Sequence, residues 1–175
     1  RSACYYSKEL DHTWLGQVRK LIFLGAPHHG AHLEKAGNMV DIILETNAYS
    51  APFSRLGKIR SSGVTDLRFG NIIDDDWHGR DRFKLSGDKR SPIPLPEVVE
   101  CYAIAATAGK SSNMLSDNLV GDGLVSVNSA LGRHKKPEFN LSFPEEHQWI
   151  GRNMGHLSLL DHPDIYKTLK NWLSA

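Results

Sequence analysis

The chain has 175 residues, the size of one ordinary domain and enough to bury a substantial core. Its 21 Lys and Arg and 20 Asp and Glu leave a formal net charge of +1 without a basic block, which excludes the usual charge pattern of nucleic-acid binding. No apolar stretch reaches the roughly 18 residues of a transmembrane helix, and no secretory signal opens the chain. We therefore expect a soluble protein, with the cytoplasm as its default compartment.

The first residues predict a helix followed by a buried strand. Residues 1–11, RSACYYSKELD, are typical of a helix but have no cap signal before them, so we expect the helix to start upstream of Arg1. Residues 20–24, KLIFL, form an apolar run bounded by Gly25 and Pro27, which is typical of a parallel strand covered on both faces. This order of elements predicts an α/β fold.

Residues 31–96 differ in character and are predicted to form a helical lid insertion. Apolar residues recur at helical spacing in 33–44 and again in 53–67, which predicts two amphipathic helices. The polar stretch 74–96 contains Gly and Pro and is typical of an irregular excursion.

The remainder of the chain returns to α/β order. Residues 98–107 predict a strand, and 120–132 predict a glycine-bounded loop that leads into a short helical turn. Further strands are expected at 139–143 (FNLSF) and 147–151 (HQWIG), and a final helix is expected to begin at Pro163. The apolar stripe of that helix consists of Ile165, Leu169, Trp172 and Leu173. The two cysteines, Cys4 and Cys101, are too few for a disulfide framework, so we expect buried free thiols, with a single bridge left open.

Asp122 and His156 have the order and setting of a catalytic acid and base. Asp122 lies between Gly121 and Gly123, whose backbone freedom can hold a carboxylate on a tight loop after a strand. His156 lies on a loop before the final helix. Each residue alone is more often a surface turn or a solvated histidine. An imidazole that acts as a general base needs a carboxylate on its other nitrogen, so the pair predicts the last two members of a Ser-Asp-His triad.

Three segments resemble bacterial lipase-like and esterase-like α/β-hydrolases: RKLIFLGAPHHGA (19–31), GDGLVSVNSALG (121–132) and NMGHLSLLDHPDIYKTLKNWL (153–173). They are similar to the family's sixth strand and lid entry, its acid loop, and its histidine loop with the final helix. The resemblance implies that residues 1–175 are the C-terminal part of one α/β-hydrolase domain with a mostly parallel sheet. It also implies that Asp122 is the triad acid and His156 the general base.

The family's nucleophile does not carry over to this chain. That serine lies in a Gly-x-Ser-x-Gly elbow, which occurs nowhere in the sequence, so the elbow and the oxyanion hole are expected upstream of Arg1. The resemblance implies a serine hydrolase of apolar acyl esters that needs no cofactor and takes its nucleophile from an N-terminal segment of the same protein. The isolated chain is expected to be inactive. Ser126, Ser129 and Ser158 do not lie at an elbow, and we expect them to cap helices or bond loops.

His28 and His29 lie where the first strand enters the predicted lid. Adjacent histidines lack the i, i+4 spacing that places two zinc ligands on one helix face. We predict them at the rim of the pocket, as substrate-binding residues or as a hinge that hydrogen-bonds the acid or base loop.

Two other functions remain open at this point. A metal-dependent hydrolase could use the acidic cluster Asp74, Asp75, Asp76, His78 and Asp81, although such runs are usually solvated. The family's calcium-binding acid, two residues after the triad histidine, is replaced here by Ser158. Alternatively, the chain is a non-catalytic piece that associates with a partner segment, because half of a sheet leaves an edge unpaired.

Overall fold

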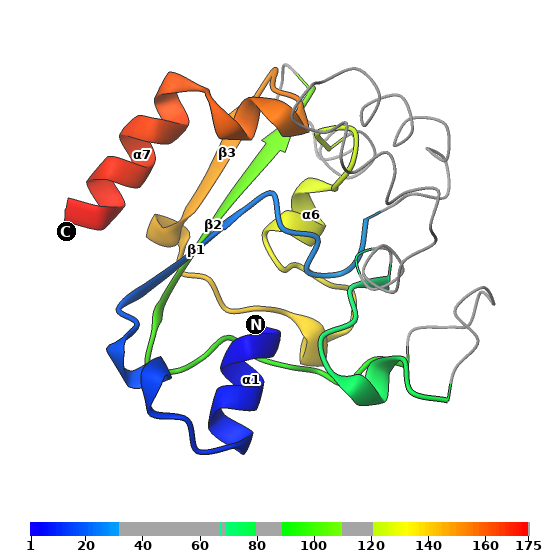
Figure 1. The fold of residues 1–175 in the computed structure, drawn as a ribbon. Helices are drawn as coiled ribbons and strands as arrows, with labels where there is room; N and C mark the ends of the chain where they lie inside the picture. The colour runs from blue at the N-terminus through cyan, green and yellow to red at the C-terminus, as the bar shows by residue number, and fades with distance from the viewer. Residues whose placement is uncertain (32–66, 68, 80–88, 110–120, 175) are drawn as a thin grey trace, which may run out of the picture.

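The computed structural model describes residues 1–31, 67, 69–79, 89–109 and 121–174. The two helices expected in the lid, at 33–44 and 53–67, fall almost entirely outside these residues, so the lid remains a prediction. The described residues form a mixed α/β structure around one sheet (Figure 1).

The sheet has three parallel strands in the order β1-β2-β3. They are β1 (Lys20–Leu24), β2 (Glu100–Thr107) and β3 (Gln148–Arg152). The register places Leu24 beside Ile104 and Ile104 beside Trp149. These strands confirm three of the four that the sequence predicts: β1 has the predicted bounds, β2 begins two residues later, and β3 is shifted by one residue.

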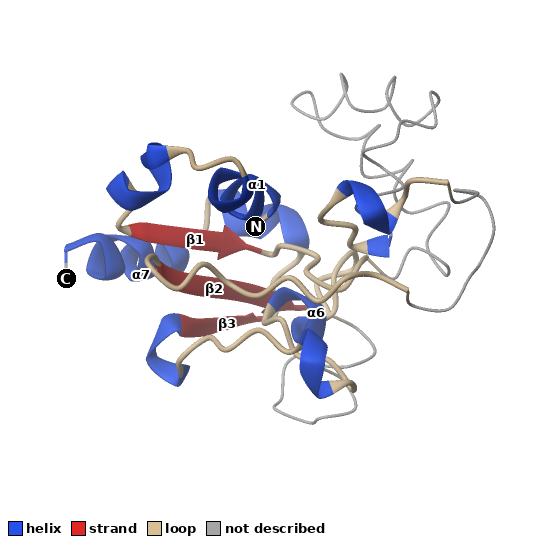
Figure 2. Ribbon diagram, turned by 90° about the horizontal axis from the view of Figure 1, so that it is seen from below, coloured by secondary structure: helices blue, strands red, loops and turns tan. Residues whose placement is uncertain are grey.

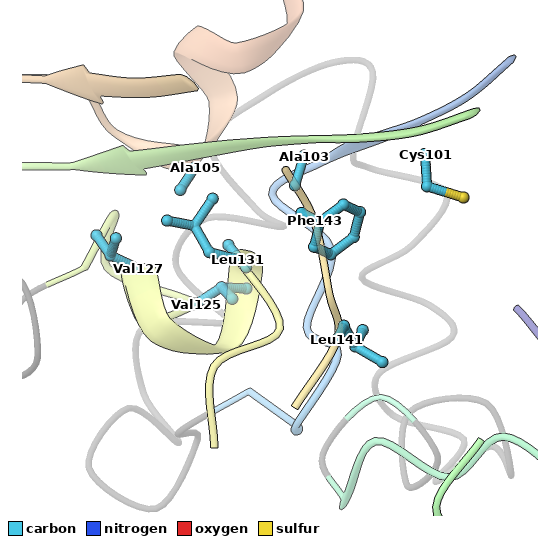
Figure 3. Close-up of a cluster of buried hydrophobic side chains, with 9 residues drawn as sticks. Cys101, Ala103, Ala105, Val125, Val127, Leu131, Leu141 and Phe143 are labelled. Atoms are coloured by element: carbon cyan, nitrogen blue, oxygen red, sulfur yellow. The ribbon is translucent and has the colours of Figure 1, made fainter. Parts of the chain in front are cut away.

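Strand β2 is the centre of the core because both of its faces are covered. Alternate side chains of a strand point to opposite faces, and here both sets are buried. Cys101, Ala103 and Ala105 pack on one face against α6 (Val127–Ala130) and neighbouring loops (Figure 3). Ile104 and Ala106 pack on the other face against the helix α7 (Pro163–Ser174).

The helices lie on both sides of the sheet, with α7 on one side and α6 and α1 (Ser2–Glu9) on the other (Figures 1 and 2). Short 3-10 turns connect them: η1 (Thr13–Gln17), η3 (Asp74–Asp76), η4 (Pro137–Phe139), η5 (Glu145–His147) and η6 (His156–Leu160). Helix α7 begins at Pro163, as expected. No helix in the described ranges is long and apolar enough to cross a bilayer.

Two predictions of local structure are wrong. Residues 139–143 do not form a strand: they begin in η4, and the amide of Leu141 donates to the carbonyl of Gly132 rather than to a strand of the sheet. The alternating Phe139, Leu141 and Phe143 are buried, and the last two pack onto the cluster on the α6 side. Leu173 of the predicted α7 stripe is 65% exposed, whereas Ile165 is 2% exposed.

Cys4 and Cys101 are both buried and unbridged, as predicted. Burial is the main reason why the pKa of the Cys101 thiol is raised to about 11, with the neighbouring Cys4 adding to the shift. This thiol is therefore protonated at neutral pH and does not have the thiolate character of a nucleophile.

Candidate active site

The loop after β2 holds Asp122 in a fixed orientation. Gly121 has φ +48° and Gly123 φ +96°, so both flanking residues take left-handed backbone angles, as their sequence predicts. The tight turn brings the amides of Leu124 and Val125 onto Oδ1 of Asp122, at 3.0 and 2.8 Å. One carboxylate oxygen is thus saturated by backbone donors, and the other is left for a side chain.

That second oxygen meets His156. The distance from Asp122 Oδ2 to His156 Nδ1 is 2.6 Å, a short hydrogen bond in which the imidazole N–H donates. The Asp122 side chain is 1% exposed, whereas that of His156 is 29% exposed. No described residue hydrogen-bonds Nε2 of His156. The structure therefore brings the predicted acid and base together, with the acid buried and the base accessible.

The loop between β3 and α7 places His156 through three backbone contacts. The amide of Met154 donates to the carbonyl of Thr107 at 3.0 Å, and that of Asn153 donates to Gly109 at 3.2 Å. The amide of His156 then donates to the carbonyl of Asp122, also at 3.2 Å. The base loop is anchored to the carboxyl end of β2 and directly to the acid, so the two loops form one unit.

His28 does not join this pair. Its side chain packs edge-on against Phe23, with ring centroids 4.6 Å apart, and lies 5.7 Å from the ring of Phe143. The residue is 5% exposed, and its Nε2 has no hydrogen-bond partner among the described residues. Burial, followed by the nearby Arg1 guanidinium, lowers the pKa of His28 from 6.5 to about 3. The ring is therefore neutral at neutral pH, and it packs against the rings of Phe23 and Phe143.

The backbone amide of His29 hydrogen-bonds the acid loop, and its ring lies near the backbone of Gly132 in the same loop. Its amide donates to Oγ of Ser129 at 3.1 Å, and that hydroxyl donates to the carbonyl of Gly30 at 2.9 Å. Burial is the largest cause of the lowered pKa of His29, about 4 instead of 6.5. The expected link between the histidine turn and the acid loop thus exists, but Ser129 makes it.

Ser126 and Ser129 have the structural roles expected of them. Ser126 is the N-cap of α6, where its Oγ accepts from the amide of Ser129 at 3.2 Å. Ser129 is 2% exposed, and its hydroxyl forms the link to the histidine turn described above.

Within the described residues, Asp76 of the acidic cluster has a structural role. Asp76 is 3% exposed, and its carboxylate accepts from the amides of Ile72, Ile73 and Ser91 at 2.8, 3.2 and 2.7 Å. Asp81 lies outside the described residues. Within the described ranges, no three His, Cys, Asp or Glu side chains are grouped so that they could hold a metal ion.

A pocket of about 450 Å³ lies between α1 and residues 93–98, away from the pair of Asp122 and His156. Its lining includes Cys4, Leu15 and Ile93 but neither member of that pair. We therefore base the candidate site on the hydrogen-bonded pair and not on this pocket.

Two residues near the pair are not among the candidate site residues that the sequence predicts. Thr107, at the end of β2, is fully buried; its carbonyl holds Met154, and its hydroxyl accepts from the amide of Gly109 at 3.1 Å. Gly25, directly after β1, lies against the ring of His156. In the sequence, the position of Gly25 between an apolar run and a proline indicates the end of a strand but not a contact with His156.

Comparison with known proteins gives no relative: no family model, no curated protein and no solved structure matches the chain.

Proposed function

We propose that this chain supplies the acid and the general base of a serine hydrolase that cleaves apolar acyl esters. The observation that carries the proposal is the 2.6 Å contact between Asp122 and His156, together with the saturation of the other carboxylate oxygen by two backbone amides. This arrangement holds Nδ1 protonated and leaves Nε2 as the basic nitrogen.

In the proposed reaction a serine hydroxyl attacks the ester carbonyl while His156 Nε2 removes its proton. Asp122 stabilises the imidazolium that forms and keeps the ring in place. The imidazolium then donates its proton to the leaving alcohol oxygen, and the acyl-serine is hydrolysed by water through the same base. Donors of an oxyanion hole are needed as well, and we expect them, like the serine, from a segment upstream of Arg1.

Ser126 and Ser129 are poor candidates for the nucleophile. The hydroxyls of Ser126 and Ser129 are used in the cap and in the link between loops. Among the described residues, neither hydroxyl forms a hydrogen bond with His156. The preference for apolar acyl chains rests on the two amphipathic helices that the sequence predicts in the lid, together with exposed Leu157 and Leu160 beside His156 in η6.

The test uses two proteins: the gene product that includes whatever precedes Arg1, and the 175-residue chain alone. We expect the longer protein to hydrolyse a chromogenic acyl ester and to be labelled by a fluorophosphonate on a serine upstream of Arg1. We expect the chain alone to do neither. Labelling of a serine inside the chain would overturn the assignment of the nucleophile, and inactivity of the longer protein on esters would overturn the proposed reaction.

A second candidate, a non-catalytic chain that binds a partner segment, is favoured by one observation. Strand β1 pairs only with β2 among the described strands, and its residues 20–24 are all partly or fully exposed although four of them are apolar. Such an edge can accept another strand. If the longer protein were inactive but retained a cooperative fold that the chain alone lacked, this candidate would replace the hydrolase.

A further inference from the structure

We propose that Gly25 is a positioning residue for His156, because the imidazole occupies space that any side chain at position 25 would need. The inference rests on the proposed function for its catalytic meaning. Its structural part, that Gly25 sets the location of the ring, can be tested separately.

Gly25 continues the sheet by one residue beyond β1. Its amide donates to the carbonyl of Ile104 at 2.8 Å, so its backbone is held against the central strand. Its φ is +58°, a left-handed angle that residues with a side chain rarely adopt. The position of this residue is therefore determined by the sheet, and the loop cannot easily move away from His156.

A Cβ atom at position 25 would collide with two side chains. It would lie 2.9 Å from Cε1 and 3.1 Å from Nδ1 of His156, and 2.5 Å from Cδ1 of Leu159. Nδ1 is the atom that bonds to Asp122. The ring edge that carries this hydrogen bond thus lies directly over the glycine backbone.

Of the two side chains, His156 has more room to move. Leu159 is 4% exposed and packs in the cluster with Ile104, Met154 and Ile165, where displacement would disturb the core. The His156 side chain is 29% exposed. A methyl group at position 25 should therefore push the imidazole outward and lengthen its bond to Asp122. A displacement of about 1 Å can cost on the order of 100-fold in rate.

The chain offers a matched control for backbone strain. Gly79 also has a positive φ, +69°, but apart from Gly79 and its two chain neighbours no described atom lies within 4 Å of the place where its Cβ would be. Alanine at either position therefore imposes a similar left-handed strain, whereas only alanine at position 25 meets the imidazole. The difference between Gly25→Ala and Gly79→Ala isolates the collision.

The experiment compares these two variants in the full gene product by two readouts. Proton NMR in water detects the low-field Nδ1–H of a histidine bonded to a carboxylate, and we expect this resonance to shift or disappear in Gly25→Ala and to remain in Gly79→Ala. In ester hydrolysis we expect kcat to fall on the order of 100-fold in Gly25→Ala with little change in KM, because ring placement and not substrate binding is affected. Gly79→Ala should retain the wild-type kcat.

A second pair of variants guards against misfolding. Leu159→Ala removes the side chain that would collide most closely with a Cβ at position 25. In the double variant with Gly25→Ala, only the collision with the ring of His156 therefore remains. We expect the double variant to lose the His156 resonance as the single Gly25→Ala variant does. An unchanged His156 resonance in both the single Gly25→Ala variant and the double variant with Leu159→Ala would overturn the inference. If the wild-type protein cleaves no ester but Gly25→Ala still displaces the resonance, the proposed function fails and the positioning of His156 by Gly25 stands.

Discussion

His28 and His156 follow the carboxyl ends of two parallel strands of the same sheet, yet their surroundings are opposite. His156 has a carboxylate on one ring nitrogen and is partly accessible to solvent. His28 is buried between aromatic rings, and its Nε2 lacks a hydrogen-bond partner in the described part of the chain. The comparison shows that a histidine just after the carboxyl end of a strand does not by that position gain a carboxylate partner or exposure to solvent. These two features distinguish His156 from His28.

The largest expected change is in kcat, and it should come from breaking the hydrogen bond between Asp122 and His156. Asp122→Asn replaces the acceptor of the Nδ1 proton by an amide that can donate to Nδ1, which favours the wrong tautomer. We expect kcat for ester hydrolysis to fall about 10⁴-fold, and His156→Asn to be at least as damaging. The loss of activity is measured by the initial rates of ester hydrolysis and by the rate of fluorophosphonate labelling of the intact protein.

The chain contains a second His-Asp pair that serves as a control. His162 Nδ1 lies 3.8 Å from Asp164 Oδ2, and the two side chains are 35% and 69% exposed. Asp164→Asn and His162→Asn should leave kcat unchanged, because an exposed and poorly aligned pair contributes little. A large loss in these variants, or none in Asp122→Asn, would contradict the roles given to the two pairs.

The next effect concerns His28 and is a loss of stability in acid. The fold favours neutral His28, since its pKa falls from 6.5 to about 3 on burial. This stabilisation is complete above the pKa of His28 in the unfolded chain. It is lost as the pH decreases toward the pKa of His28 in the folded protein. From about pH 7.5 to about pH 5 we expect His28 alone to cost about 2 kcal/mol in the free energy of unfolding.

Urea unfolding at several pH values measures this cost. His28→Phe keeps an aromatic ring beside Phe23 and Phe143 but removes the titrating group, so its stability should depend less on pH than that of the wild type. Equal pH dependence in the wild type and His28→Phe would show that the buried ring is not the acid-sensitive group.

Much of the fold could be predicted because it depends on local patterns. The apolar run of β1, the start of α7 at Pro163 and the glycines around Asp122 each act over a few residues. The prediction at 139–143 failed because alternation reports which side chains are buried and not which hydrogen bonds the backbone makes. Phe143 is buried on a face of the sheet although its segment does not pair with a strand.

The pairing of Asp122 with His156 could be predicted from the sequence, whereas the other contacts of the two residues could not. Asp122 and His156 were identified because a base needs a carboxylate, which is a chemical rule. The contact of Gly25 with His156 joins residues far apart in the sequence, and no local pattern encodes it. The same holds for the hydroxyl of Ser129, which bonds the carbonyl of Gly30 across 99 positions.

The smallest expected change is in the free energy of unfolding of Ser129→Ala. This variant tests whether the orientation of the Asp122–His156 pair depends on the turn that contains His28. Ser129→Ala leaves the amide of His29 and the buried carbonyl of Gly30 without their shared partner, which should cost about 1 to 2 kcal/mol of unfolding free energy. Ser126→Ala is the matched control, because it removes one cap bond of the same helix, should cost about 1 kcal/mol and leaves that link intact.

Asp122 is held by the amides of its own loop, so Ser129→Ala should reduce stability while kcat falls by less than about 10-fold. Urea unfolding and ester hydrolysis of the same samples separate the two quantities. If kcat in Ser129→Ala fell as far as in Asp122→Asn, the orientation of the acid would depend on the histidine turn. The two regions would then act as one catalytic unit, and the contrast between His28 and His156 would describe two parts of one site.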